Sequence, residues 1–200
     1  MVTLAVVEAA QEVARLALLS AGCAEVGPHP LELRIKWPND VYGRGLKVGG
    51  VLCGSTHSDG FFRVTVGVGL NATNREPTTC LSALIEAAAL AAGAAPERLP
   101  PLSREALLAA VMGRYEALEA RFVGEGGFEG LREAYLSHWL HTGQQVTLLE
   151  PPQAEVRLTI RGLARSGYLL AEDERGGLCE LHPDGNSLDF WKGLIRRKVI

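Results

Sequence analysis

Residues 36–52 read KWPNDVYGRGLKVGGVL, and this stretch says most about how the chain folds. It brings the acid of Asp40 and the ammonium of Lys47 close in sequence to backbone that Gly49 and Gly50 leave bare. A proline fixes one φ angle, and two short polar side chains and an aromatic share the same turn, which is a rare combination in an ordinary core. The stretch is therefore a candidate site as well as a candidate strand-and-turn unit.

The sequence on either side of this stretch predicts strands. Apolar residues alternate with charged ones over residues 31–37, which is typical of a half-buried strand. We expect a turn at residues 38–40 and a reversal of the chain over residues 41–45. Two further strands, 46–55 and 61–70, are separated by Ser-Asp-Gly and predict a hairpin. The sequence thus predicts a β-meander with the candidate site at its strand ends.

The regions around the meander have a helical period. Residues 3–20 are rich in Ala and Leu and predict a mostly buried helix that ends near Gly22. A period of 3.6 returns at residues 81–92, 103–122 and 128–139, with Ser103 as an expected N-cap and Gly93 as an expected C-cap. We expect these three helices to cover the sheet.

After residue 142 the pattern changes to short strands. Gly, Pro or Asp-Gly separate five such segments, at residues 145–149, 155–163, 168–172, 178–181 and 187–190. This predicts a small SH3-like β-barrel over residues 142–200, with a tight hairpin at 183–186 and a basic, solvated end at 196–198. The predicted fold class is α+β, with a mixed or antiparallel sheet covered by helices over residues 1–141.

Composition excludes several function classes. A hydrophobic share of 47%, a charged share of 22% and a net charge of −3 favour a globular chain and give no reason to expect nucleic acid as a partner. Charged residues interrupt the apolar segment 2–19, so no membrane helix is expected. The cysteines form no Cys-x-x-Cys pair, so we predict no zinc site and a cytoplasmic protein; they are Cys23, Cys53, Cys80 and Cys179.

The order of the motifs resembles the catalytic domain of biotin protein ligases. The stretch at 36–52 is followed by GVGLN at 67–71, and the segments 139–146 and 182–187 are similar to the holocarboxylase synthetases of animals. The resemblance implies a class II synthetase-like fold. It also implies an ATP-dependent enzyme that makes biotinyl-5′-AMP with Mg²⁺ and passes biotin to a lysine of a carboxylase carrier domain. A homodimer and a mitochondrial location stay open.

Lys47 and Asp40 are the predicted catalytic residues. Beside two glycines, the Lys47 ammonium could stabilise charge that develops on a carboxylate or phosphate oxygen, although an isolated strand lysine is usually just solvated. Asp40 could hold or deprotonate an incoming amine, and its structural alternative is an acceptor that closes the turn. The resemblance supports the functional interpretation of both, with Lys47 at biotin and its activated carbonyl.

The remaining candidates line the expected ligand path. Asn71 offers a donor and an acceptor suited to an adenine edge, and Asn39 joins it as an adenylate-binding candidate although the turn explains it well. Four glycines are predicted to give biotin access to the backbone, namely Gly49, Gly50, Gly67 and Gly69. A close strand–helix contact explains a lone Gly-x-Gly about as well. His138 and His141 are expected as core or boundary residues, and Trp37 is expected in the core.

One departure from the family bears on activity. Biotin protein ligases carry a Ser-Thr-Asn stretch and a Gly-Arg-Gly-Arg loop before the Trp-Pro-Asn-Asp motif, and these 200 residues contain neither. Gly43-Arg44-Gly45 lies after that motif, so the loop's role is not transferred to Arg44. The resemblance therefore predicts a truncated catalytic domain with exposed sheet edges and with weak or no activity as an isolated chain.

Two other interpretations stay open from the sequence. A truncated isoform or fragment could act as a noncatalytic binding module. A lipoate or octanoate ligase on a related fold is disfavoured, because those catalytic domains are not expected to carry a barrel with a His-Pro-Asp-Gly-Asn turn. The sequence leaves open which carboxylase would be the acceptor and whether Met1 is the true start.

Overall fold

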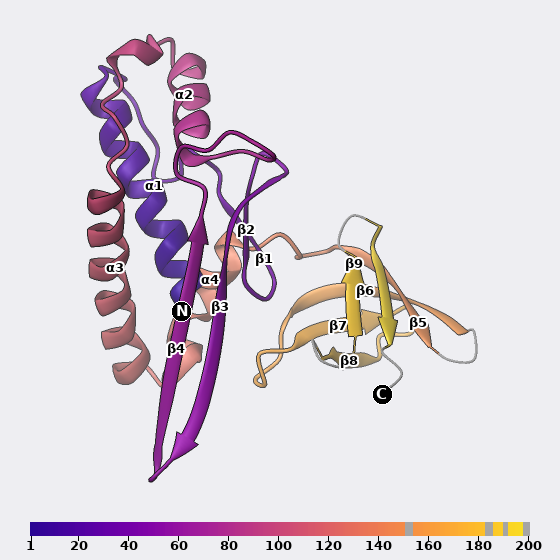
Figure 1. The fold of residues 1–200 in the computed structure, drawn as a ribbon. Helices are drawn as coiled ribbons and strands as arrows, with labels where there is room; N and C mark the ends of the chain where they lie inside the picture. The colour runs from indigo at the N-terminus through magenta and orange to yellow at the C-terminus, as the bar shows by residue number, and fades with distance from the viewer. Residues whose placement is uncertain (151–153, 183–185, 190–191, 198–200) are drawn as a thin grey trace. The chain divides into compact units, whose positions relative to one another are not determined.

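The fold is described from a computed structural model that covers residues 1–150, 154–182, 186–189 and 192–197. It is a mixed α+β fold with helices and largely antiparallel sheets, as predicted (Figure 1). The chain divides into two compact units, Met1–His138 and Trp139–Ile200. None of the helices in the described ranges is both long enough and apolar enough to cross a membrane.

The first unit contains four strands, four α-helices and two short 3₁₀ helices. In chain order they are α1 Val2–Ser20, β1 Arg34–Lys36, β2 Asp40–Gly43, β3 Leu46–Ser58, β4 Phe61–Leu70, α2 Leu81–Ala91, η1 Pro96–Arg98, α3 Arg104–Gly124, η2 Gly127–Leu131 and α4 Arg132–His138. The strands form one antiparallel sheet in the order β1-β2-β3-β4, as expected for a meander.

Strand β1 is shorter than predicted. Glu32 has a positive φ of 49°, which interrupts extended backbone, so only Arg34–Lys36 pair with β2. The predicted alternation of burial is nevertheless confirmed. Leu31, Leu33, Ile35 and Trp37 are all buried.

The hairpin of β3 and β4 is the longest feature of the sheet (Figure 1). Asp59 and Gly60 both have positive φ, the backbone of a tight two-residue turn between twisted strands. Beyond Val51 every residue of the hairpin is exposed through to Gly69, and β4 is an edge strand. The expectation of an exposed sheet edge is therefore met at β4.

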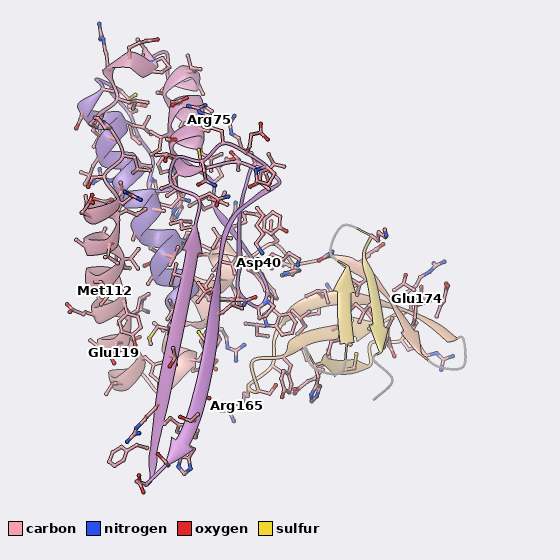
Figure 2. All side chains as sticks on the ribbon, viewed as in Figure 1. Asp40, Arg75, Met112, Glu119, Arg165 and Glu174 are labelled. Carbon is pink, nitrogen blue, oxygen red and sulfur yellow. The ribbon has the colours of Figure 1, made fainter. Side chains whose placement is uncertain are left out.

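Helix α1 is the most deeply buried helix of the first unit. It packs against α3, against α2 and against the β1–β3 part of the sheet, and its first three turns are almost wholly buried. Ser103 caps α3 as predicted, since its hydroxyl accepts a hydrogen bond from the Ala106 amide at 3.1 Å. Met112 and Glu119 project from the exposed side of α3, where Met112 is about half exposed (Figure 2).

The helix predicted at 128–139 is instead two pieces, η2 and α4. Gly126 and Gly127 both have positive φ, which ends regular α-helix before this segment begins. Ring packing of Phe128 on Tyr135, with centroids 5.7 Å apart, joins the two pieces. His138 is buried as expected.

The second unit is a six-stranded sheet in the order β8-β7-β6-β5-β10-β9. Its strands are β5 Gln145–Glu150, β6 Ala154–Leu163, β7 Leu169–Asp173, β8 Leu178–Leu181, β9 Asn186–Asp189 and β10 Leu194–Arg197. Five were predicted, and β10 was not. Residues 196 and 197, part of the segment expected as a basic, solvated end, have backbone that pairs in this sheet.

Pairing explains why β10 was missed. It runs parallel to β5, a partner almost fifty residues away, so no turn in the nearby sequence predicts it. Ile195 is buried in the sheet, and His141 is fully buried at the start of this unit. Residues 183–185 of the predicted hairpin lie outside the described ranges, as does residue 198.

Candidate functional site

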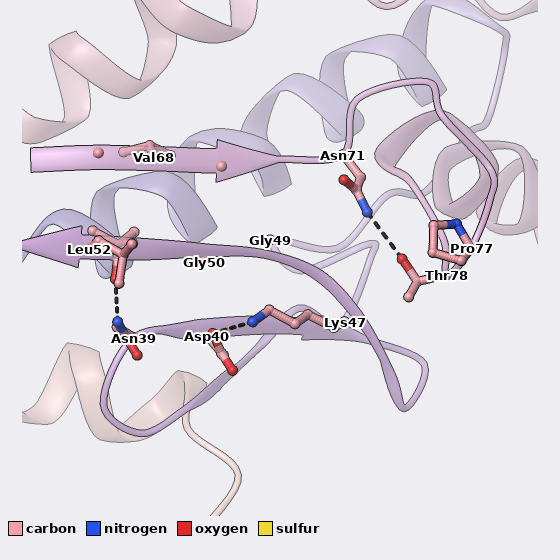
Figure 3. A pocket seen from close by; sticks show the side chains of 13 residues that line it. Asn39, Asp40, Lys47, Gly49, Gly50, Leu52, Val68, Asn71, Pro77 and Thr78 are labelled. Carbon is pink, nitrogen blue, oxygen red and sulfur yellow. Dashed lines mark hydrogen bonds and ion pairs between the residues drawn. The ribbon is translucent and has the colours of Figure 1, made fainter. Parts of the chain in front are cut away.

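A cavity of about 700 Å³ lies on one face of the four-stranded sheet (Figure 3). That volume is within the range of about 300–1,000 Å³ usual for small-molecule sites. All eight residues predicted from the sequence line it, namely Asn39, Asp40, Lys47, Gly49, Gly50, Gly67, Gly69 and Asn71. The structure thus brings the candidates together in one place.

A β-bulge at Val48 determines which face Lys47 occupies. Val41 pairs with Gly49 and Tyr42 pairs with Lys47, so Val48 is left between them without a partner on β2. Alternation along an unbroken strand would place Lys47 and Gly50 on opposite faces. The extra residue puts them on the same face, where Asp40 stands directly opposite Gly50.

The two predicted catalytic residues form an ion pair. The Nζ atom of Lys47 lies 2.7 Å from Oδ1 of Asp40 (Figure 3). Nearly half of the Lys47 side chain is exposed, against 22% for Asp40. A second ammonium, that of Lys36, lies 3.8 Å from Oδ2 of the same carboxylate. The lysine that faces the cavity is therefore the more exposed member of the pair.

Asp40 is the first residue of β2, and the prediction that it forms part of the turn was wrong. The turn closes one residue earlier, because Asp40 already pairs with Lys36 of β1. The Val51 amide donates to the Asn39 carbonyl at 2.8 Å and the Asn39 side-chain amide donates to the Val51 carbonyl, and these bonds tie the turn to β3. Tyr135 supports the preceding residue, with its hydroxyl donating to the Pro38 carbonyl at 3.2 Å. Asp40 is then free to pair across both neighbouring strands.

Tyr135 is suited to this structural role. It is 5% exposed, and burial raises the pKa of its hydroxyl above the ordinary value, because a phenolate would lose its water. The neutral hydroxyl therefore remains a hydrogen-bond donor to Pro38 throughout the physiological range. Trp37 is also buried beside this turn, which confirms its predicted place in the core.

The four glycines serve the site in two different ways. A Cβ on Gly50 would lie 2.9 Å from Oδ1 of Asp40, and a Cβ on Gly49 would lie 2.5 Å from the Gly69 carbonyl oxygen. The lack of a side chain at Gly49 and Gly50 therefore lets other groups of the protein lie close to this strand. At Gly67 and Gly69 the nearest atom to an added Cβ is 4.0 Å away, so the backbone there borders open space.

Asn71 stands at the end of β4, where the sheet leads into the loop before α2. Its side-chain amide donates to the Thr78 hydroxyl and to the Thr79 carbonyl, both at 3.1 Å. These two bonds fix the orientation of the amide group. The backbone carbonyl oxygen of Asn71 accepts from the Leu81 amide at 2.9 Å, which ties this corner of the cavity to α2.

The sequence interpretation missed the apolar wall of the cavity. Leu52 is 75% exposed and Val68 is 46% exposed, which is unusual for aliphatic side chains. Pro77 and Thr78 complete the lining from the loop before α2. Leu52 pairs with Gly67 and lies within the predicted strand 46–55, so the predicted hairpin already contained this wall residue, although its role was not recognised. An apolar wall beside an ion pair suits a ligand with an aliphatic part and a charged end.

Metal coordination has little support in this region. In the parts of the chain that the structure describes, no cluster of three His, Cys, Asp or Glu side chains is placed to hold a metal ion. The one carboxylate on the cavity lining faces two lysines. A dedicated protein cage for Mg²⁺ is therefore not found among the described residues.

Comparison with known proteins identifies the family of the chain. The model of the Biotin/lipoate A/B protein ligase family matches residues 2–71, which include the turn, the bulge and both cavity strands. The chain is 44% identical over 201 residues to biotin–protein ligase 1, chloroplastic, of Arabidopsis thaliana, covering 99% of this chain and 50% of that protein. The chain belongs to the biotin protein ligase family.

A second Arabidopsis thaliana protein, biotin–protein ligase 2, is also 44% identical, over 204 residues that cover 99% of this chain and 56% of that ligase. The apo structure of the biotin protein ligase from Aquifex aeolicus shares the fold, with a TM-score of 0.59 and 22% identity over 98% of this chain and 75% of that one. The chain spans about half the length of the two plant ligases.

Proposed function

We propose that the chain is the biotin- and nucleotide-binding part of an ATP-dependent biotin ligase. The observation that supports this most strongly is the convergence of Lys47 and Asp40, 2.7 Å apart, on one cavity with a bare main-chain floor. In this proposal, biotin and ATP are substrates, and the product is an amide between biotin and a lysine of a carboxylase carrier domain.

Lys47 acts in the first step. The biotin carboxylate attacks the α-phosphorus of ATP, the bond to the departing pyrophosphate breaks, and biotinyl-5′-AMP forms. Negative charge gathers on the phosphoryl oxygens in this step, and an ammonium within a largely apolar cavity stabilises it. Because the Lys47 side chain is half exposed on a flexible stem, it can turn from Asp40 towards the ligand.

Asp40 acts in the second step. The acceptor amine forms a bond to the acyl carbon of the adenylate, the carbon–oxygen bond to phosphate breaks, AMP leaves, and the amine gives up a proton. A carboxylate within hydrogen-bond reach holds the amine in line and receives that proton. Asp40 is fixed for this purpose by strand pairing with Lys36 on one side and Gly50 on the other.

The rest of the cavity fits the two halves of the adenylate. Leu52 and Val68 offer apolar surface to the aliphatic chain of biotin, and Gly67 and Gly69 allow it to lie against backbone. Asn71, held by Thr78, offers polar contacts at the opposite end, where we place adenine. Mg²⁺ would arrive bound to the phosphates of ATP, the usual arrangement for this ion.

The two units are assigned different parts of this function. We propose that residues 1–141 form the part of the catalytic domain that carries these residues. Residues 142–200 are proposed as a small SH3-like barrel, supported by six short strands with buried Val146, Ile160 and Ile195 at their centre. The four cysteines form no disulfide with one another, which favours a reducing compartment such as the cytosol.

We infer that these 200 residues alone form the adenylate slowly. They contain no Gly-Arg-Gly-Arg sequence, the element that in this family supplies arginine to the phosphate. Loss of one preorganised group that stabilises developing charge typically costs about 10²–10³-fold in rate. Binding of a finished adenylate should suffer less, because it depends on the cavity that is present.

The test is calorimetric titration of the chain with biotin and then with a nonhydrolysable biotinyl-5′-AMP mimic, together with biotin-dependent exchange of pyrophosphate into ATP. We expect the mimic to bind, Lys47→Met to weaken that binding, and exchange to be slow. A chain that binds neither ligand would overturn the proposed function. Exchange at the rate of a full-length biotin protein ligase would overturn the inferred slowness and leave the ligase assignment intact.

A further inference from the structure

Lys36 is a charged residue of the site that the proposed mechanism has not used. It does not line the cavity, yet its Nζ atom lies 3.8 Å from Oδ2 of Asp40, while Lys47 approaches Oδ1 at 2.7 Å. The two ammonium groups thus stand at different oxygens of one carboxylate. Three charges, two positive and one negative, make up the cluster.

The backbone gives the two lysines different freedom. Lys36 pairs directly with Asp40 across β1 and β2, and 21% of its side chain is exposed. Side chains directly opposite on neighbouring antiparallel strands are close neighbours, so Lys36 is held near Asp40 by the sheet itself. Lys47 is on the bulged side of β3 and 47% of its side chain is exposed. Lys36 is therefore the fixed neighbour, and Lys47 the movable one.

A bound ligand gives the difference in freedom between Lys36 and Lys47 a functional consequence. Lys47 cannot remain 2.7 Å from Asp40 and also give its full charge to a carboxyl or phosphoryl oxygen deeper in the cavity. When it turns to the ligand, Asp40 loses its nearest cation at the moment when it has to receive the acceptor amine. We propose that Lys36 is a positioning residue that holds the Asp40 carboxylate in place once Lys47 has moved to the ligand. This inference rests on the proposed function.

The experiment supplies chemically made biotinyl-5′-AMP and a carrier domain, so that only the transfer step is measured. Lys36→Met is compared with Lys36→Arg, which keeps the charge, and with Arg63→Met, which removes a charge from exposed β4. We expect Lys36→Met to bind the mimic as wild type does and to transfer biotin about tenfold more slowly, the size expected of a misplaced group. Lys36→Arg should recover most of that rate, and Arg63→Met should lose none.

A second measurement needs no activity. The urea midpoint of Lys36→Met is compared with wild type, and that of the Lys36→Met/Lys47→Met double variant with Lys47→Met alone. If Lys36 becomes the main ion-pair partner of Asp40 when Lys47 is absent, Lys36→Met lowers the urea midpoint more in the Lys47→Met background than in wild type. Equal losses in the two backgrounds would overturn the role of Lys36.

The outcomes separate the two proposals. Wild-type chain that binds and transfers, together with Lys36→Met that transfers equally fast, overturns the positioning role and leaves the ligase function standing. Wild-type chain that does not bind the mimic overturns the function. Where the wild-type chain binds the mimic without transferring biotin, the comparison of midpoints decides for or against Lys36.

Discussion

Gly50 lies directly across from Asp40, so that a Cβ at Gly50 would be only 2.9 Å from the carboxylate oxygen that holds Lys47. The same Cβ would be 3.7 Å from Cε of Lys47. The ion pair therefore occupies the space that any other residue at position 50 would fill. The site therefore requires glycine at position 50, in addition to any requirement of the strand.

Gly50→Ala should therefore lower activity more than stability. The methyl group displaces the end of a side chain, so we expect the unfolding free energy to change by no more than about 1 kcal/mol. Transfer from supplied biotinyl-5′-AMP should fall about tenfold or more, because the carboxylate leaves its position. Gly54→Ala is the matched control on the same strand, since nothing lies within 4 Å of an added Cβ there. Equal transfer rates in the two variants would contradict this.

Gly49 and Gly67 should separate stability from binding. A methyl group on Gly49 meets the Gly69 carbonyl at 2.5 Å and the Leu70 Cα at 3.2 Å, and backbone cannot move aside cheaply. We expect Gly49→Ala to cost about 1–3 kcal/mol of unfolding free energy in urea titrations. Gly67→Ala has open space, so it should fold normally and weaken mimic binding about tenfold, or about 1.4 kcal/mol. Normal stability of Gly49→Ala would show that β3 and β4 approach each other less closely than described.

The two asparagines predicted from the sequence to bind the adenylate should also behave differently. Asn39→Ala removes the bond to the Val51 carbonyl that ties the turn to β3, so we expect a loss of about 1 kcal/mol in stability with mimic affinity changed little. Asn71→Ala removes an amide fixed by Thr78 at the cavity wall, and mimic affinity should fall about tenfold. Calorimetry and urea titration on both variants measure this. If only Asn39→Ala lowers the affinity for the mimic, then Asn39 and not Asn71 contacts the adenylate.

Most of the secondary structure followed from local pattern. The helix at Val2–Ser20, the hairpin of β3 and β4 and the cap at Ser103 each depend on residues close together in sequence, and all three were predicted. Turn residues, apolar periodicity and capping are local physics. Such features can be derived without knowing what the chain later packs against.

What was missed depends on distant partners. The bulge at Val48 arises from how β3 pairs with β2, and Val-Gly-Gly looks the same in a regular strand. Strand β10 forms against β5, and Leu52 becomes a cavity wall only because it faces Gly67. The residues of the candidate site were predicted, whereas the geometry that unites them was not. In particular, Asp40 was expected in a turn and is held in a strand.

His138, which does not line the cavity, makes the stability of the fold depend on pH. His138 is 4% exposed, and its ring packs edge-on against His29 with centroids 4.7 Å apart. Burial, helped by the neighbouring charges of His29 and Arg34, lowers the pKa of His138 from 6.5 to about 4. The buried ring therefore stays neutral at pH values where the same histidine in the unfolded chain takes up a proton.

The sign of the effect follows from where the proton binds. Between pH 6.5 and about 4 the unfolded chain binds this proton and the folded chain does not, so stability falls as pH falls through that window. From pH 7 to pH 5 the loss due to His138 is about 2 kcal/mol, which urea titrations at the two pH values should detect. His138→Gln should remove most of this dependence, whereas His57→Gln, at an exposed position of β3, should leave it unchanged. Equal pH dependence in wild type and His138→Gln would mean that His138 is already accessible to protons in the folded chain.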